Sequence, residues 1–506
     1  MASLKGVLRR LFLVLDRPLD ACFGTSGNPL AQLGALGFFF YWIVAVSGIY
    51  LYVFFDTGIS EAYASVEYMT NEQWYLAGVM RSLHRYASDA LVLVMLLHIT
   101  REFAFDRYRD SRWFTWVTGT PILWLVYASG ITGYWLVWDL LAQLIATRTT
   151  EWLDWLPIFG EPIARNFLTP ERLDDRFFTL LVFLHIALPL ILLLVLWLHL
   201  QRVSRARWNP ERRLAIGVTA MLLVVSLLKP AESHAPADLT QVPGEVGLDW
   251  FYLPAYPLLD ATSAGLLWAV AFAGTLLLLL LPVLPPKRRP PAAEVHLQEC
   301  NGCARCAADC PYGAIRLRPR SDGLPFEHEA VVDPQLCTSC GICAGACPTA
   351  IPFRRASALV PGIELPEYPI AALRQRCHEA AEGLSGGGRI LVFACEYGAP
   401  ARRLGDTSVG VVELPCIGML PPAFVDYVLS RELADGVLLA GCPENSCFHR
   451  LGAEWTRQRL AGERDPYLRR RVPRERLDVE WLAENDGARL QRALSDFRER
   501  LGDSDG

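Results

Sequence analysis

Two pairs of histidines share the same spacing along the chain. His84 and His98 are separated by thirteen residues, and so are His185 and His199. The residues between them are almost all apolar, so each pair is predicted to lie in one hydrophobic helix, where the second histidine returns to the same face about 21 Å along the axis. A metal or haem between facing helices needs such convergent imidazoles. A hydrogen-bonded core histidine is the simpler explanation for any one of the four. Ionisable groups inside a membrane are costly and usually functional, however, so four in matched register predict two stacked sites.

Two cysteine runs further along the chain repeat the pattern Cys-x2-Cys-x2-Cys-x3-Cys-Pro. This spacing resembles that of bacterial two-cluster ferredoxins, in which three cysteines of one run and the last of the other hold each [4Fe–4S] cluster. The resemblance assigns Cys300, Cys303, Cys306 and Cys347 to one cluster, and Cys337, Cys340, Cys343 and Cys310 to the other. Disulfides are one alternative, which a reducing compartment disfavours. Zinc is the other, and it would not need the doubled pattern.

Three apolar segments after these runs each end in a cysteine. They are predicted strands at 389–395, 409–416 and 436–442, with a helix near 421–433. Ligands collect at the carboxyl ends of strands in an open α/β sheet, so three strand-end thiols can converge with a fourth. Four thiolates complete the ligand set of one Fe–S cluster, here Cys395, Cys416, Cys442 and Cys447. Buried unligated cysteines and a zinc site are the alternatives.

The chain divides into an apolar, aromatic-rich half up to about residue 290 and a charged half that holds most of the fourteen cysteines. The net charge of −5 gives no reason to expect nucleic-acid binding. Cys22 and Cys377 have no evident partner and are interpreted as free thiols. The basic N-terminus has too short an apolar run for a signal peptide, and an interfacial amphipathic helix is expected there.

Six stretches of the first half are long and apolar enough to be predicted membrane spans. They are 32–55, 76–100, 113–138, 177–200, 212–228 and 262–285. The loops after the second, fourth and sixth are rich in arginine and lysine, whereas the loops after the first and fifth are mainly acidic. The positive-inside rule then places the N-terminus and the cysteine-rich half on the cytoplasmic side of a bacterial inner membrane.

Glycines with matched spacing stand in two of the predicted spans, Gly34 and Gly48 in the first and Gly119 and Gly133 in the third. With the histidine pairs, they make residues 1 to about 285 resemble cytochrome b of the quinol:cytochrome c oxidoreductase and b6f families. The resemblance implies two b haems, with glycines where the haem edges approach the backbone. It pairs His84 with His185 near the outer face and His98 with His199 near the cytoplasmic face, and it turns Arg81 and Arg101 toward haem propionates. The loop charges give the same pairing.

The resemblance extends to quinone pockets. Residues 133–139 resemble the stretch beside the family's outer pocket, and residues 248–254 stand where its Pro-Glu-Trp-Tyr motif would be. Asp249 replaces the glutamate that accepts a quinol proton, on a shorter arm. The candidate catalytic residues are Asp249, Asp139 and Tyr252; a helix-terminal or interfacial acid is the alternative for Asp249. At the inner face, Ser204 stands where the family often has a quinone-binding histidine.

The segment 361–460 resembles the delta subunit of methyl-viologen-reducing hydrogenases through FAC, LPCIG and DGVLLAGCPENSC. That resemblance implies a [2Fe–2S] cluster that exchanges electrons with a flavoprotein. The charged tail from about residue 463 is expected to be helical, without evident chemistry.

The sequence therefore predicts a multidomain protein. A six-span α-helical cytochrome b bundle occupies 1–290, a small α+β ferredoxin-like domain 291–360, and a small α/β domain with a charged tail 361–506. Two b haems, two [4Fe–4S] clusters, one [2Fe–2S] cluster and quinone are the expected cofactors. No hydride-transfer or dinucleotide motif is evident, so a soluble flavoprotein or dehydrogenase partner is expected to oxidise the substrate.

The leading hypothesis is a quinone oxidoreductase subunit of a respiratory chain, homodimeric through its cytochrome b domain. Quinone-based electron bifurcation is the alternative within this class. A redox sensor or membrane anchor is the alternative from another class, and it would not need two haems across a bilayer.

Overall fold

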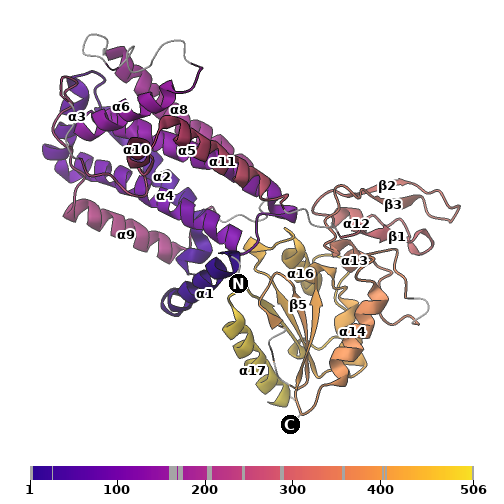
Figure 1. The fold of residues 1–506 in the computed structure, drawn as a ribbon. Coiled ribbons are helices and arrows are strands. Elements are labelled where there is room, and N and C mark those ends of the chain that lie inside the picture. The colour runs from indigo at the N-terminus through magenta and orange to yellow at the C-terminus, as the bar shows by residue number, and fades with distance from the viewer. Residues whose placement is uncertain are drawn as a thin grey trace. The chain divides into compact units, whose positions relative to one another are not determined.

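The computed structural model describes residues 4–24, 27–158, 168, 175–201, 208–241, 246–284, 290–355, 359–401, 404 and 407–503 (Figure 1). The described chain forms two compact units, one up to residue 285 and the other from residue 286 onward.

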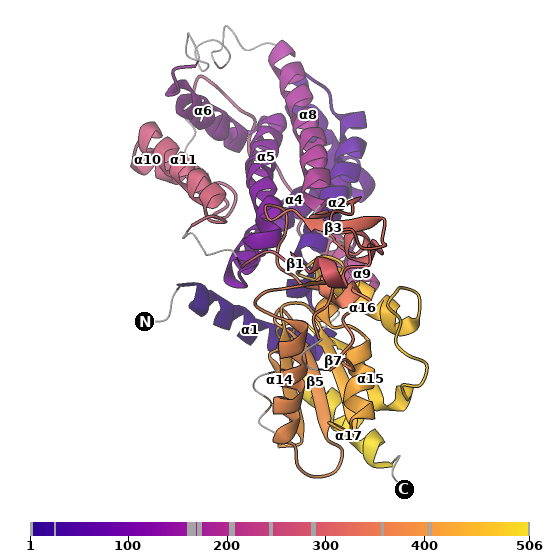
Figure 2. The same cartoon turned by 90° about the vertical axis from the view of Figure 1, so that its right-hand side faces the viewer.

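The first unit is helical. Its helices are α1 (Leu4–Phe23), α2 (Leu33–Phe54), α3 (Glu61–Asn71), α4 (Val79–Ala104), α5 (Trp113–Val137), α6 (Leu140–Asp154), α8 (Asp175–Leu200), α9 (Arg212–Leu228), α10 (Ala255–Ala261) and α11 (Ala264–Leu280), with short turns η1 (Pro29–Gln32), η2 (Trp74–Gly78) and η3 (Asp110–Arg112). Each predicted span overlaps one of these helices. Helix α2 packs along α4, and α5 packs along α8 (Figure 2).

Three of these helical stretches are long and apolar enough to cross a membrane by length and composition among the described residues: Pro29–Phe54, Trp113–Val137 and Asp175–Leu200. Helix α11 is apolar but shorter. Helix α4 is long, but charged side chains such as Arg81, Arg85 and Asp89 interrupt its apolar character. The six-span arrangement therefore stays a prediction.

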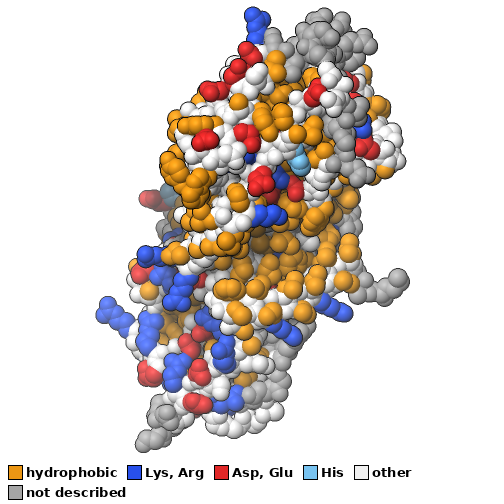
Figure 3. Space-filling view, turned by 90° about the vertical axis from the view of Figure 1, so that its left-hand side faces the viewer, with side chains coloured by type: hydrophobic (Ala, Val, Ile, Leu, Met, Phe, Trp, Pro, Cys, Tyr) orange, Lys and Arg blue, Asp and Glu red, His pale blue; other side chains and the backbone are white. Residues whose placement is uncertain are grey.

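Many large apolar side chains of these helices are exposed. Ile49 and Val53 of α2 are 70% and 71% exposed, and Leu190 of α8 is 62% exposed. Figure 3 shows hydrophobic side chains spread over a broad area of one face. Water-soluble proteins rarely expose contiguous apolar surface on this scale, whereas a lipid bilayer accommodates it.

Helix α1 lies where an interfacial amphipathic helix was expected. Leu4, Val7 and Leu11 are exposed, whereas Asp16 is buried and accepts hydrogen bonds from both terminal nitrogens of Arg101 at 3.2 and 3.0 Å. The Asn28 amide also donates to Asp16, at 3.0 Å. A buried, doubly hydrogen-bonded ion pair therefore ties α1 to the end of α4.

The second unit contains a parallel sheet with the strand order β6-β5-β7-β8. Its strands are β5 (Ile390–Cys395), β6 (Val409–Leu414), β7 (Gly436–Gly441) and β8 (Leu477–Trp481), and its longer helices are α14 (Ile370–Glu382), α15 (Ala423–Ser430), α16 (Gly452–Ala461) and α17 (Gly487–Asp503). Strands β5 and β7 are apolar and fully buried because both faces of the sheet are covered. Helices α14 and α15 pack on one face and α17 on the other.

The charged tail differs from the prediction. It was expected to be helical, but β8 extends the sheet by pairing with β7 before α17 begins. The five residues of β8 alternate apolar and acidic side chains, a strand pattern that the surrounding arginines obscure in the sequence.

The ferredoxin-like segment shares the second unit. It contains the hairpin of β2 (Ile315–Pro319) and β3 (His328–Val332), with the short helices α12 (Arg305–Ala308) and α13 (Ile342–Ala346). Strand β1 (Glu294–Val295) pairs with β4 (Ile363–Glu364), so the segment is joined across the predicted boundary near residue 360. Of the two cysteines without a predicted role, Cys377 is buried in the core of this unit, and Cys22 of α1 is exposed.

Candidate redox-cofactor sites

Each of the four histidines of the helical unit faces one glycine of a neighbouring helix. The facing pairs are His84 with Gly48, His98 with Gly34, His185 with Gly133, and His199 with Gly119. A Cβ atom would stand 2.9 Å from the imidazole Cε1 at Gly48 and Gly133, 3.3 Å at Gly119 and 3.5 Å at Gly34. At the first two positions only glycine fits without displacing the ring.

The imidazole Nδ1 atoms are fixed by the same helices. His84 Nδ1 lies 2.9 Å from the Val44 carbonyl oxygen, and His185 Nδ1 lies 3.0 Å from that of Ser129. Because a carbonyl oxygen can only accept, Nδ1 carries the proton and Nε2 keeps a free lone pair, as a metal-ligating imidazole requires. Each of these carbonyls belongs to the residue four positions before the facing glycine.

Hydroxyl side chains complete this arrangement. Ser47, Thr132 and Thr118 stand directly before Gly48, Gly133 and Gly119, and their oxygens lie 3.1 to 3.2 Å from the Nδ1 atoms of His84, His185 and His199. None of these hydroxyls was predicted from the sequence. A hydroxyl residue followed by glycine, at the spacing of the histidines, is the signal that could have found them.

The paired histidines come from opposite helix pairs. The rings of His84 of α4 and His185 of α8 have their centroids 6.2 Å apart. With metal–nitrogen bonds of about 2 Å, two imidazoles on opposite sides of one ion have centroids about 6 Å apart, so this pair fits a bis-histidine haem. His98 likewise lies close enough to His199 to interact with it electrostatically.

Asp249 lies in a polar network between α4 and α5. The Tyr134 hydroxyl donates to its carboxylate at 2.7 Å, and Arg85 forms an ion pair with it. Arg85 also pairs with Asp89 at 3.2 Å. The ring of Tyr252 lies 5.6 Å from that of Tyr134, so the structure brings two of the predicted catalytic residues, Asp249 and Tyr252, to one region.

Tyr252 is nearly fully buried, and its hydroxyl lies directly over the backbone of Gly130. Its hydroxyl contacts the Val126 carbonyl at 3.3 Å and the Ser88 hydroxyl at 3.4 Å. A side chain at Gly130 would therefore displace Tyr252.

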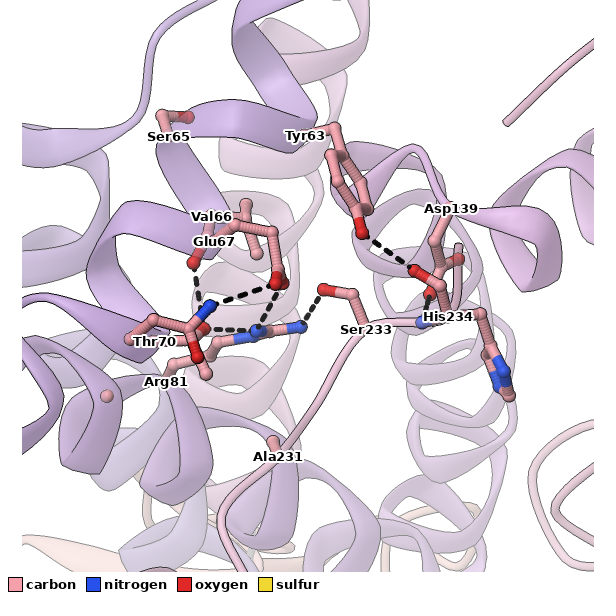
Figure 4. Close-up of polar contacts among 12 residues, drawn as sticks. Tyr63, Ser65, Val66, Glu67, Thr70, Arg81, Asp139, Ala231, Ser233 and His234 are labelled. Atoms are coloured by element: carbon pink, nitrogen blue, oxygen red, sulfur yellow. Dashed lines mark hydrogen bonds and ion pairs between the residues drawn. The ribbon is translucent and has the colours of Figure 1, made fainter. Parts of the chain in front are cut away.

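Asp139 belongs to a different cluster, which Figure 4 shows. One carboxylate oxygen caps α6 by accepting from the Ala142 amide at 2.9 Å, and the other accepts from the His234 amide at 2.9 Å. Both carboxylate oxygens thus accept hydrogen bonds from backbone amides, which gives Asp139 a structural role at the start of α6. Its catalytic role stays a prediction.

The two predicted propionate arginines are engaged with protein groups. Arg81 donates to Thr70 and, at 2.7 Å, to Ser233, and it lies 3.6 Å from Glu67 (Figure 4). Arg101 pairs with Asp16, as described above. Ser204, the candidate for the inner quinone pocket, lies outside the described residues.

The eight ferredoxin-type cysteines surround two separate hollows. Cys300, Cys303, Cys306 and Cys347 line one, and Cys310, Cys337, Cys340 and Cys343 line the other. Each group takes three cysteines from one run and the fourth from the other run. Within the described chain, no three His, Cys, Asp or Glu side chains are arranged to hold a single metal ion. Four cysteines around each hollow fit the ligand set of one iron–sulfur cluster.

Burial raises the pKa of Cys306 and that of Cys340 to about 12, with neighbouring cysteines adding to the effect for both. These thiols would stay protonated at neutral pH without a cation. Iron binding would have to displace their protons, which would couple cluster assembly to the fold.

Four more cysteines meet at the carboxyl edge of the parallel sheet. Cys395 and Cys442 have their sulfurs 4.0 Å apart, and Cys447 hydrogen-bonds with Cys416 and Cys442. Hydrogen bonds from those two thiols hold the pKa of Cys447 well below its usual range. All four are buried, so the group is a closed set of thiols that fits a small cluster.

Glycine is required beside this group too. A Cβ at Gly452, the first residue of α16, would lie 2.3 Å from the Cys416 sulfur. The N-terminus of α16 therefore approaches the thiols directly, and its positive end favours their ionised form.

Three parts of the chain match known families. Residues 27–206 match the family model for cytochrome b/b6/petB. Residues 299–351 match that of the 4Fe-4S dicluster domain, and residues 390–503 match that of the delta subunit of methyl-viologen-reducing hydrogenase.

Two cytochrome b proteins agree with the first match. Cytochrome b of Akanthomyces muscarius is 26% identical over 292 residues, which are 51% of this chain and 74% of that protein. Cytochrome b of Zymoseptoria tritici is 27% identical over 288 residues, 50% of this chain and 72% of that protein. A solved structure titled hyperthermophilic respiratory Complex III aligns with a TM-score of 0.42 and 21% identity, over 50% of this chain and 75% of that one.

These matches imply b-type haem in the cytochrome b part and iron–sulfur clusters in the dicluster part. With the apolar helices, they indicate a multi-pass membrane protein that transfers electrons.

The glycine contacts make a specific prediction. Gly48→Ala should lower the haem content of the isolated protein by up to one haem per chain, because the new methyl group displaces His84. Gly37→Ala in the same helix is the matched control, since its Cβ would stand 3.9 Å from Leu91 and Val94. Haem extracted per polypeptide measures the effect, and equal haem content in both variants would contradict it.

Proposed function

We propose that this chain carries electrons between a cytoplasmic flavoprotein or dehydrogenase and the membrane quinone pool. The proposed carriers are one [2Fe–2S] cluster, two [4Fe–4S] clusters and two b haems. The observation that carries this proposal is that one polypeptide combines two facing histidine pairs with three groups of four cysteines.

The proposed ligands follow these groups. His84 and His185 would hold one haem, and His98 and His199 the other. Cys395, Cys416, Cys442 and Cys447 would hold the [2Fe–2S] cluster, as the match to a hydrogenase delta subunit suggests. When bound, these groups supply one-electron chemistry, and the protein contributes ligand orientation and exclusion of water.

The direction across the membrane rests on the loop charges. Arginine-rich loops follow the second, fourth and sixth predicted spans, which supports a cytoplasmic location for the cysteine-rich half. In that orientation His98 and His199 lie nearer the cytoplasm. The haem at His84 and His185 would then lie nearer the outer face, beside Asp249.

Asp249 is the proposed proton acceptor for quinol oxidation. Arg85 and the Tyr134 hydroxyl fix its carboxylate, so a quinol hydroxyl would need to replace one of these contacts to deliver its proton. Tyr252 would close the pocket floor over Gly130.

The Asp249 role has a direct test. Asp249→Asn should slow haem reduction by added quinol by about 10²-fold or more, the usual effect of losing a general base. Asp260→Asn, which alters another aspartate paired with an arginine, should leave the rate unchanged. Stopped-flow absorbance in membranes measures both. A quinol rate in Asp249→Asn equal to that of Asp260→Asn would remove Asp249 from the mechanism.

The order of the haems has a second test. His98→Leu removes a ligand of the cytoplasmic-side haem, so reduction of the remaining haem by a low-potential donor should be lost or much slower. His84→Leu should lose the outer haem while the cytoplasmic-side haem is still reduced. Rapid-mixing spectroscopy of membranes distinguishes the two. The proposed order is wrong if His98→Leu reduces its remaining haem at the normal rate and His84→Leu reduces none.

A further inference from the structure

One arginine is buried between two of the cysteine groups. Arg459 of α16 is 1% exposed. Its Nη1 donates to the Gly418 carbonyl at 2.9 Å, and its Nη2 donates to the Asp309 carboxylate at 2.5 Å and approaches the Ile342 carbonyl at 3.4 Å. Burying a guanidinium is costly, and a guanidinium buried this completely needs a compensating charge nearby.

The partners of Arg459 are sequence neighbours of cysteines from both groups. Asp309 precedes Cys310, and Ile342 precedes Cys343. Gly418 is two residues after Cys416. Arg459 thus lies where the hollow of Cys310, Cys337, Cys340 and Cys343 meets the sheet-edge group. The sheet-edge group consists of Cys395, Cys416, Cys442 and Cys447.

Electrostatic contact links the two groups directly. Cys416 interacts with Arg459 and also with Cys340. Cys416, Cys340 and Ile342 also belong to one buried cluster of side chains, which Trp455 of α16 completes. The cysteine group of the second hollow is therefore adjacent to the sheet-edge group.

Within the described chain, the ion pairs of Arg459 and Arg464 go to one carboxylate, that of Asp309. Asp309 carries one carboxylate, which is shared by Arg459 and, at 2.8 Å, by Arg464. The two guanidiniums leave one positive charge in excess beside the cysteines. Arg459 Nε is also a buried donor without an acceptor in the described chain. An anionic acceptor at the cysteine groups would balance the excess positive charge and could accept a hydrogen bond from Arg459 Nε. A thiolate-ligated cluster is such an acceptor.

We propose that Arg459 is a positioning residue that sets the potentials of two adjacent clusters, the [4Fe–4S] cluster of Cys310, Cys337, Cys340 and Cys343 and the sheet-edge [2Fe–2S] cluster. This rests on the proposed function. Its positive charge favours the reduced, more negative state of both. One electron then passes between them, oxidising one cluster and reducing the other, without a proton or a bond change. The cluster of Cys300, Cys303, Cys306 and Cys347 lies outside this pair.

The test is a redox titration of the full-length protein followed by electron paramagnetic resonance. Arg459→Met should lower the one-electron reduction constant of each of the two adjacent clusters tenfold or more. This corresponds to a shift of about 59 mV to more negative potential. Arg459→Lys, which keeps the charge, should recover part of the shift. Arg471→Met removes an arginine paired with Asp426 instead and should leave all potentials unchanged.

Signals are assigned to clusters with Cys303→Ser and Cys337→Ser, each of which alters one [4Fe–4S] cluster. The proposal is overturned if Arg459→Met moves no potential, moves all three equally, or moves only the cluster altered by Cys303→Ser. If Arg459→Met does not assemble, Arg464→Met is used instead. It removes a partly exposed positive charge that is paired with the same Asp309 carboxylate. The proposal then requires a smaller shift of the potentials in the same direction. A wild-type protein without three cluster signals would instead refute the proposed function.

Discussion

Close contact between a glycine backbone and an imidazole ring is the constraint on which the helical unit depends. At Gly48 and Gly133 no Cβ can stand where the ring lies, so α2 approaches α4, and α5 approaches α8, closely enough for helix carbonyls to reach Nδ1. Those carbonyls fix the tautomer and leave the Nε2 lone pair available. The interhelical approach and the ligand chemistry are therefore set by the same residues.

The cysteine-rich unit has a different constraint, which is the burial of many thiol groups close together. A parallel sheet delivers three strand ends to one edge, and the glycine at the start of α16 lets that helix N-terminus reach Cys416. The ferredoxin-like segment places its second group of cysteines against the same edge, with Arg459 between the two. A helix N-terminus and a buried arginine thus lie beside these thiols, where both favour negative charge.

Much of this arrangement follows from the sequence, because periodicity and spacing are local signals. The ends of β5, β7 and α9 lie within one residue of their predicted limits, since an apolar run bounded by charged or turn residues leaves little freedom. Strand β8 was missed because five residues among arginines give a weak pattern. Asp139 was assigned to catalysis by resemblance, which cannot show that both its oxygens hold backbone amides. The contact of Arg459 with Asp309 joins residues 150 positions apart, beyond any local pattern.

The central claim is that one chain assembles two haems and three clusters, and cofactor analysis of the purified full-length protein tests it most directly. Extracted haem and total iron and sulfide, each per polypeptide, are the quantities to measure. The account predicts two b haems and about ten cluster irons, since two [4Fe–4S] clusters and one [2Fe–2S] cluster supply them. About eight cluster irons with bound zinc, or fewer than two haems in a fully loaded preparation, would contradict it.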